Sequence, residues 1–164
     1  MDGITKTQKA LKSFNSRLDI HFGIVTIAEK IKRWDIVGNQ LVQILKVSKE
    51  INNNWLWGPI NSMDGNPRNF MIQNIVSRTA ELFETNTPVS DEAFRKVSEA
   101  LTQFYPKEIY GYANLGLYYA TKNRYDLAEQ YFKKALKIDP NDKIVLGNMK
   151  HLKELQRNLE KTNK

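Results

Sequence analysis

Apolar residues recur along this chain three or four positions apart, in segments that polar and turn residues separate. The pattern is most regular at Ala128, Phe132 and Ala135, because these steps place side chains on one face of a helix. Pro140 cannot continue a helix and is expected to end that segment. The spacing therefore predicts an all-α protein built from amphipathic helices.

The same spacing is found again 91 positions earlier in the chain. Apolar residues occupy both members of each corresponding pair, which are Ala128 and Val37, Phe132 and Leu41, and Ala135 and Ile44. Gly116 differs, because the residue that corresponds to it is Val25. Apolar residues alternate over 18–24 as in a strand, but their helical spacing continues to residue 31 and favours a helix. Residues 18–51 therefore predict a degenerate copy of the same helical hairpin.

A third copy is expected over residues 67–106. Pro67 suits the first turn of a helix that runs to about residue 85. The buried stripe of this helix is expected to hold six apolar residues: Phe70, Ile72, Ile75, Val76, Leu82 and Phe83. Ser90, with acidic residues after it, is expected to cap the second helix, and Pro106 is expected to end it.

Both ends of the chain carry a further helical pattern. Residues 4–14 contain QKALK, which echoes KKALK at 133–137, and they predict the second helix of a repeat without its first. Such a half repeat indicates either a cut from a longer array or a cap made of one helix. Residues 143–160 predict a capping helix with a polar outer face. Its inner stripe is expected to hold six apolar residues: Val145, Leu146, Met149, Leu152, Leu155 and Leu159.

An inserted segment, residues 52–66, separates the first two copies. It is rich in Asn, Gly and Pro and therefore predicts a loop. Trp55 and Trp57 lie within it. Either these side chains contact a partner, or they fold back and fill a gap between neighbouring hairpins. The second interpretation is favoured because exposed pairs of tryptophans are costly.

The stretch of residues 109–142 is 34 residues long and resembles the tetratricopeptide repeat (TPR) family. The resemblance rests on eight positions: Tyr112, Leu115, Gly116, Tyr119, Ala128, Phe132, Ala135 and Pro140. It implies a right-handed superhelical array of antiparallel helical hairpins, which is a TPR-like α–α solenoid. Residues 1–164 would then form a single TPR-like domain, composed in order of the half repeat 4–14, the repeat 18–51, the loop 52–66, the repeats 67–106 and 109–142, and the capping helix 143–160.

The net charge of +7 is concentrated at the two ends of the chain. Residues 1–51 carry nine Lys and Arg against five Asp and Glu, and residues 143–164 carry six against two. Such an excess attracts nucleic acids or acidic surfaces. Because the lysines form no dense run, a solvated surface is favoured over a nucleic-acid site.

Missing residue types exclude several classes of site and anchor. Without cysteine the chain has no disulfide, no thiolate metal ligand and no cysteine nucleophile. No run of about 18 apolar residues predicts a membrane-spanning helix, so a soluble protein is expected. The compartment stays open: cytoplasmic if the chain is complete, and periplasmic or secreted if an upstream leader has been removed.

Signatures of catalysis and of cofactor binding are also missing from the sequence. It has no Gly-rich phosphate loop, and neither His21 nor His151 has a second ligand at metal-binding spacing. His21 lies in an apolar helix, where a packed and hydrogen-bonded histidine is expected. We therefore expect no enzyme, no catalytic residue, no cofactor and no metal.

The resemblance to TPR proteins implies a non-catalytic scaffold for protein–protein interaction. In that family the first helices of the repeats line a concave face that binds a peptide segment or a partner surface. Carried over, the candidate residues are Phe70, Gln73, Asn74, Ser77, Tyr110, Asn114 and Leu117, then Asp19, Phe22 and Thr26 in the first repeat, and Trp55 and Trp57 in the loop. One subgroup of the family grips C-terminal carboxylates with Lys and Arg, whereas this sequence keeps only an asparagine there, so that mode is not expected.

Other functions remain open beside a protein or peptide partner. The basic ends of the chain would serve nucleic-acid binding, which is less favoured because the cations are scattered. The chain would alternatively be a fragment of a larger TPR assembly subunit. The half repeat at residues 4–14 would then dock onto further helices or support self-association.

Overall fold

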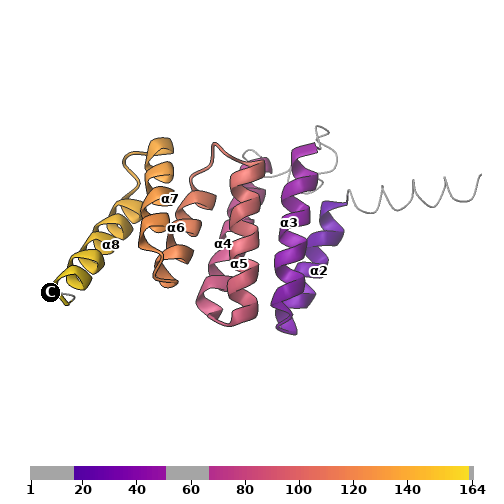
Figure 1. The fold of residues 1–164 in the computed structure, drawn as a ribbon. Coiled ribbons are helices and arrows are strands. Elements are labelled where there is room, and N and C mark those ends of the chain that lie inside the picture. The colour runs from indigo at the N-terminus through magenta and orange to yellow at the C-terminus, as the bar shows by residue number, and fades with distance from the viewer. Residues whose placement is uncertain (1–16, 51–66, 163–164) are drawn as a thin grey trace, which may run out of the picture. The chain divides into compact units, whose positions relative to one another are not determined.

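The computed structural model of the chain describes residues 17–50 and 67–162. Within these residues seven helices pack in sequential hairpin pairs, which confirms the predicted all-α fold (Figure 1). The helices are α2 (Leu18–Lys30), α3 (Trp34–Glu50), α4 (Pro67–Thr85), α5 (Pro88–Phe104), α6 (Tyr110–Thr121), α7 (Tyr125–Ile138) and α8 (Lys143–Thr162).

The chain divides into two compact units, Met1–Val97 and Ser98–Lys164. The division falls within α5, so the first unit contains α2, α3, α4 and the beginning of α5. The second unit contains the end of α5 together with α6, α7 and α8. The single domain and the repeat boundaries expected from the sequence stay predictions.

The turn between α2 and α3 reverses the chain through one left-handed residue, Lys32, with φ of 58°. The Lys32 N–H donates to the carbonyl oxygen of Glu29 at 3.0 Å, and the Arg33 N–H donates to that of Ala28 at 2.8 Å. This pair of bonds satisfies the last carbonyl groups of α2 in a Schellman motif. The segment that alternates like a strand is thus helical, as the longer periodicity predicts.

The start of α5 corrects one prediction, because Ser90 is not the residue that caps the helix. Thr87 Oγ1 accepts from the Ser90 N–H at 3.1 Å, and Ser90 Oγ accepts from the Thr87 N–H at 2.9 Å. The two hydroxyls therefore form a reciprocal capping box. Pro88 occupies the first helical position, where its fixed φ suits the helix and its missing N–H costs nothing.

The core of the first unit lies where the second-helix spacing places it. Val37, Leu41 and Ile44 of α3 are buried, as are Ala93 and Val97 of α5. Backbone approach is close at one point, since a Cβ added to Gly38 would lie 2.7 Å from the Ala93 Cβ. The rings of Phe83 and Phe94 join α4 to α5, with their centroids 5.1 Å apart.

The buried stripe of α4 differs in part from its prediction. Ile72, Ile75 and Leu82 are buried, and so is Met71, which the sequence pattern did not single out. Phe70, by contrast, is 45% exposed. Residues two positions apart lie about 200° apart around a helix, so burial of Ile72 turns Phe70 away from the core.

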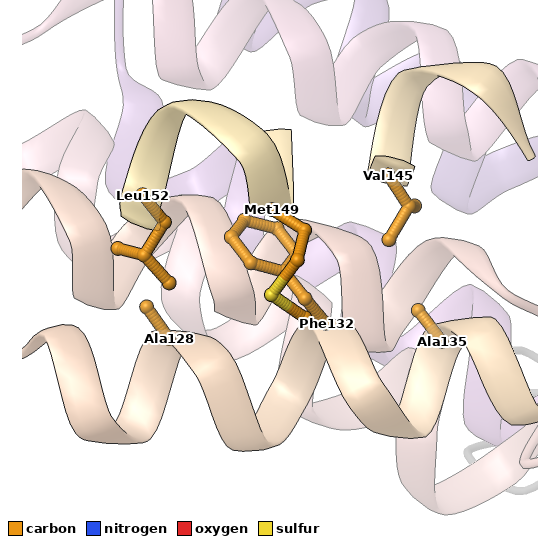
Figure 2. Packing of buried hydrophobic residues seen from close by; sticks show 6 residues of the cluster. All are labelled: Ala128, Phe132, Ala135, Val145, Met149 and Leu152. Carbon is orange, nitrogen blue, oxygen red and sulfur yellow. The ribbon is translucent and has the colours of Figure 1, made fainter. Parts of the chain in front are cut away.

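The core of the second unit joins α7 to α8 (Figure 2). It is formed by Ala128, Phe132 and Ala135 of α7 and by Val145, Met149 and Leu152 of α8. Gly116 of α6 makes room for the Phe132 ring, because a Cβ at this position would lie 2.4 Å from the ring carbons.

The inner stripe of α8 is shorter than predicted. Leu146 and Leu159 are 45% and 46% exposed, although Leu152 is buried. Leu146 lies about 100° around the helix from buried Val145. Leu159 lies near the end of α8, which has 20 residues, whereas its neighbour α7 has 14. The last turns of α8 therefore continue past the start of α7.

Candidate functional site

A groove of about 310 Å³ lies between α2 and α4 in the first unit. It is lined by two residues of α2 and four of α4: Asp19, Phe22, Phe70, Met71, Asn74 and Arg78. Positions four apart on α4, at 70, 74 and 78, share one helix face, which is the reason they meet the same groove. Four of the six lining residues are candidates from the sequence.

The apolar part of the groove consists of two aromatic rings and a thioether. Phe70 is 45% exposed and Phe22 is half-buried, whereas Met71 is fully buried. Partly exposed rings gain free energy when a ligand removes them from water, by about 25 cal/mol for each Å² covered. This part of the groove suits an apolar side chain of a partner.

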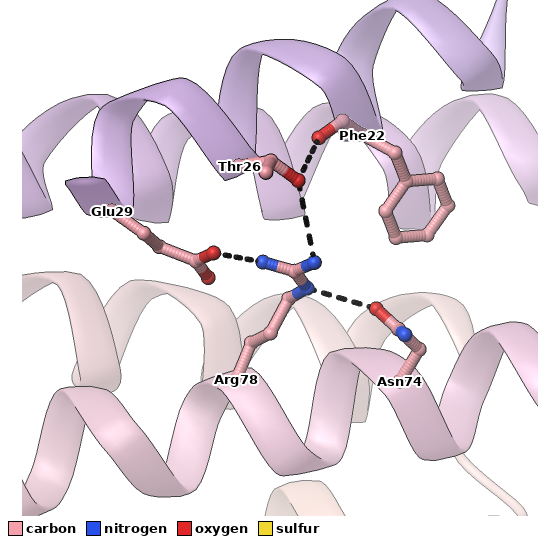
Figure 3. A network of polar contacts seen from close by, with 5 residues as sticks. All are labelled: Phe22, Thr26, Glu29, Asn74 and Arg78. Atoms are coloured by element: carbon pink, nitrogen blue, oxygen red, sulfur yellow. Dashed lines mark hydrogen bonds and ion pairs between the residues drawn. The ribbon is translucent and has the colours of Figure 1, made fainter.

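The polar part of the groove is organised by Arg78 (Figure 3). Its Nη1 donates to Glu29 Oε2 and its Nη2 donates to Thr26 Oγ1 at 3.5 Å, so the guanidinium joins α4 to α2. Its Nε donates to Asn74 Oδ1 at 2.9 Å. The Thr26 hydroxyl donates to the Phe22 carbonyl oxygen at 3.0 Å.

Charges around the groove are compensated by pairs. The Arg78–Glu29 pair is mostly buried, with side chains 20% and 19% exposed. Asp19 accepts two hydrogen bonds from Arg17, at 2.8 and 2.6 Å. The hydrogen bond from Arg17 lowers the pKa of Asp19, so this carboxylate is charged and paired near neutral pH. Both charged side chains among the described lining residues, Asp19 and Arg78, are therefore paired, and this chemistry suits an uncharged segment.

Asn74 supplies the directional contact. Its carbonyl oxygen is held by Arg78, which turns a flexible amide into a fixed one. Its amide nitrogen remains able to donate to a peptide carbonyl oxygen. The groove thus combines an apolar cleft with one oriented donor.

The candidate residues from the sequence fall into three groups. Phe70, Asn74, Asp19 and Phe22 line the groove. Gln73 and Ser77 are exposed on α4 but lie outside its lining. Trp55 and Trp57, like the segments 4–14 and 52–66, lie outside the described residues.

Three further candidates lie on α6 in the second unit. Tyr110, Asn114 and Leu117 are all half-buried. Leu117 packs against the α7–α8 core, and Ala113 does the same. Leu117 therefore supports the fold of its own unit.

Met71 and Arg78 line the groove, and Glu29 pairs with Arg78, but the sequence pattern singled out none of the three. Arg78 stands four positions after Asn74, a spacing that places both side chains on one face of α4. That spacing was a usable signal. The pairing with Glu29 was not, because the two residues are 49 positions apart in the sequence.

The histidine of α2 is placed as the sequence predicts. His21 is buried, and its Nδ1 lies 2.6 Å from Gln40 Oε1, so it is packed and hydrogen-bonded as predicted. Over residues 17–50 and 67–162 no group of three His, Asp or Glu could hold a metal ion. None of the described helices has both the length and the apolarity needed to cross a bilayer.

Comparison with known proteins gives one match. Residues 109–142, which form α6, α7 and the turns beside them, match the tetratricopeptide repeat family. Repeats of this family are typically non-catalytic, and no catalytic family matches the chain. No curated protein matches the chain.

Proposed function

Since residues 109–142 are a tetratricopeptide repeat, which indicates a protein–protein interaction module, we propose that the chain binds a peptide segment or partner surface through the first helices of its hairpins. The main site of this proposal is the groove between α2 and α4. Phe22 and Phe70 would receive an apolar side chain of the partner. Asn74 would donate to the peptide backbone beside it.

One observation carries the proposal: an apolar groove contains half-exposed aromatic rings next to an asparagine that Arg78 holds in place. Aromatic anchors in pockets dominate the binding free energy of protein interfaces. Pre-oriented polar groups lower the entropic cost of association. The compensated charges favour a partner segment whose contact residues are apolar or amide-bearing rather than acidic or basic.

The test replaces Phe70 by Glu and Asn74 by Ala in one variant. Partners are captured from the native cell with the wild-type chain and with the variant, and the captured proteins are quantified by mass spectrometry. A partner of the groove should be lost from the variant, with at least about tenfold weaker binding when it is then measured pairwise.

A matched control makes the same kind of change, from an apolar residue to an acidic one, outside the groove. Ile144→Glu also converts an exposed apolar residue to an acid, since Ile144 is 73% exposed on α8. This control should retain every partner. Equal capture by the groove variant and by the wild type would refute the site, provided that both show the same urea midpoint.

A second variant addresses α6. Tyr110→Ala combined with Asn114→Ala removes two half-buried side chains and leaves Leu117 in the core of its unit. Loss of the same partner from this variant would show that α6 also contributes to binding. Retention of the partner would confine it to α2 and α4.

A further inference from the structure

The second unit carries another groove, of about 650 Å³, which the proposed function does not use. It lies between the start of α7 and the C-terminal half of α8. Charged and apolar side chains line it together, among them Arg124, Asp126, Leu127, Lys153, Arg157 and Leu159.

The groove results from the unequal lengths of two packed helices. With 14 residues in α7 and 20 in α8, the two helices differ in length by roughly 9 Å. Leu152 of α8 is buried in the same cluster as Ala128 of α7. After Leu152, α8 continues past the first residue of α7. Leu159 therefore lies beside the turn between α6 and α7 and is 46% exposed.

The turn that forms the opposite wall is well ordered. Asn123 has φ of 57°, and the Arg124 N–H donates to the Tyr119 carbonyl oxygen at 2.9 Å. Tyr125 Oη donates to Asn123 Oδ1, also at 2.9 Å.

Among the described residues, three cations line this groove, and the carboxylate of Asp126 lines it beside them. Among the residues whose side chains the structure describes, none forms an ion pair with Arg124, Lys153 or Arg157. All three side chains are exposed. Like charges around one concavity repel one another and raise the local concentration of anionic groups.

The equivalent residues of the first unit behave differently. Arg33 stands 91 positions before Arg124, and it donates two hydrogen bonds to Asp35, at 2.9 and 2.7 Å. Asp126 stands at the position equivalent to Asp35 but has no such bond with Arg124. Arginine and aspartate thus form an ion pair in the first hairpin. In the second hairpin the same two residue types line the groove and do not bond to each other.

We infer that this groove docks an acidic segment of a partner protein, with an apolar side chain placed between its carboxylates. The cations would pair with the carboxylates, and Leu127 and Leu159 would contact the apolar side chain. The volume of the groove lies within the range of about 300–1,000 Å³ that is usual for ligand sites. A single nucleic-acid strand fits less well, because leucines rather than a row of aromatic rings supply the apolar lining, and bases stack on rings.

The test uses a fluorescein-labelled peptide that repeats Glu-Glu-Leu, with binding to the full chain followed by fluorescence anisotropy at low salt. Lys153→Glu combined with Arg157→Glu should weaken binding at least about tenfold. Lys143→Glu combined with Lys150→Glu makes the same charge change on α8, at exposed residues outside the lining. This control should stay within about twofold of the wild type.

Two further probes separate the contributions. A peptide that repeats Glu-Glu-Gln lacks the apolar side chain and should bind more weakly than Glu-Glu-Leu, and Leu159→Asn should remove that difference. A labelled thymidine oligonucleotide should bind no more tightly than the peptide.

Several results would overturn the inference. If both charge-reversal variants weakened peptide binding equally, the peptide would be responding to the net charge of the protein and not to this groove. Tighter binding of the oligonucleotide that depends on Lys153 and Arg157 would assign the groove to nucleic acid. Absence of binding by any probe would remove the site. The Phe70→Glu variant should bind the peptide as the wild type does, so the proposed function and this site fail independently.

Discussion

The hairpins α2–α3 and α6–α7 have the same backbone plan but different residues at its critical points. Their second helices begin 91 positions apart, and so do the residues that turn each hairpin, Lys32 at φ 58° and Asn123 at φ 57°. The next N–H donates in both cases to the fifth carbonyl oxygen before it, at 2.8 and 2.9 Å. One turn geometry thus persists while the family pattern is recognisable in only one of the two hairpins.

The packing of the two hairpins differs at one pair of corresponding positions. In α6–α7 the pair is Gly116 and Phe132, and the glycine leaves space for the ring. The equivalent residues of α2–α3 are Val25 and Leu41, both fully buried. The two pairs carry the same number of side-chain carbon atoms, divided differently between the first and the second helix. Exchanges that conserve volume are the ones that cores tolerate best.

The largest expected effect on stability comes from changing only one residue of the Gly116–Phe132 pair. Gly116→Val should destabilise the protein by about 3 kcal/mol, because the new side chain would overlap the Phe132 ring. The measurement is the free energy of unfolding from urea titration followed by circular dichroism.

The double variant Gly116→Val with Phe132→Leu carries over the pair found in the first hairpin. It should be more stable than Gly116→Val alone by about 1–2 kcal/mol. If the changes in the free energy of unfolding caused by the two single substitutions simply added up in the double variant, the two residues would not be coupled.

A smaller effect is expected at the turns. Lys32 has a Cβ in the left-handed region, which costs about 1 kcal/mol, whereas asparagine is tolerated there more easily. Lys32→Gly should therefore raise the free energy of unfolding by about 1 kcal/mol, and Asn123→Gly by only a few tenths. Equal gains at the two turns would contradict the distinction. Thermal unfolding of both variants beside the wild type measures it.

The smallest effect concerns the ion pair that only the first hairpin forms. The hydrogen bond from Arg33 lowers the pKa of Asp35 to about 2, from 3.8. Because the folded pKa is the lower one, this pair stabilises the protein above pH 3.8, and the contribution is lost as pH falls toward 2. Asp35→Asn should therefore lower the urea midpoint near neutral pH.

The matched variant is Asp126→Asn, which removes a carboxylate that has no arginine partner. It should change the urea midpoint less than Asp35→Asn does near neutral pH. The two variants should converge as the medium is acidified. A difference that persists at low pH would show that Asp35 acts by something other than its ion pair.

The fold was largely predictable because it depends on local periodicity. The spacing at 128, 132 and 135 located each second helix, and Pro67 located the start of α4. The cap of α5 was misassigned because Thr87 and Ser90 exchange hydrogen bonds, so either residue type fits a cap in the sequence. Which of the two precedes the helix depends on Pro88, where the first turn begins. The exposure of Leu159 depends on where the neighbouring helix starts, which periodicity within α8 does not contain.

The candidate sites were predictable only in part. Phe70 and Asn74 follow from the helix face that lies beside the packing stripe. The role of Arg78 depends on Glu29, which reaches it only once α2 and α4 are packed. The groove beside α8 depends on two helix lengths and on three cations that no local pattern links.

The contact between Arg78 and Glu29 joins α4 to α2 across 49 positions of sequence. In a helical array each hairpin depends mainly on its nearest neighbours, and such contacts make neighbours open together. The backbone amides of α2 and α4 should accordingly exchange hydrogen with solvent as one cooperative unit. A ligand held between the two helices would slow exchange in both at once.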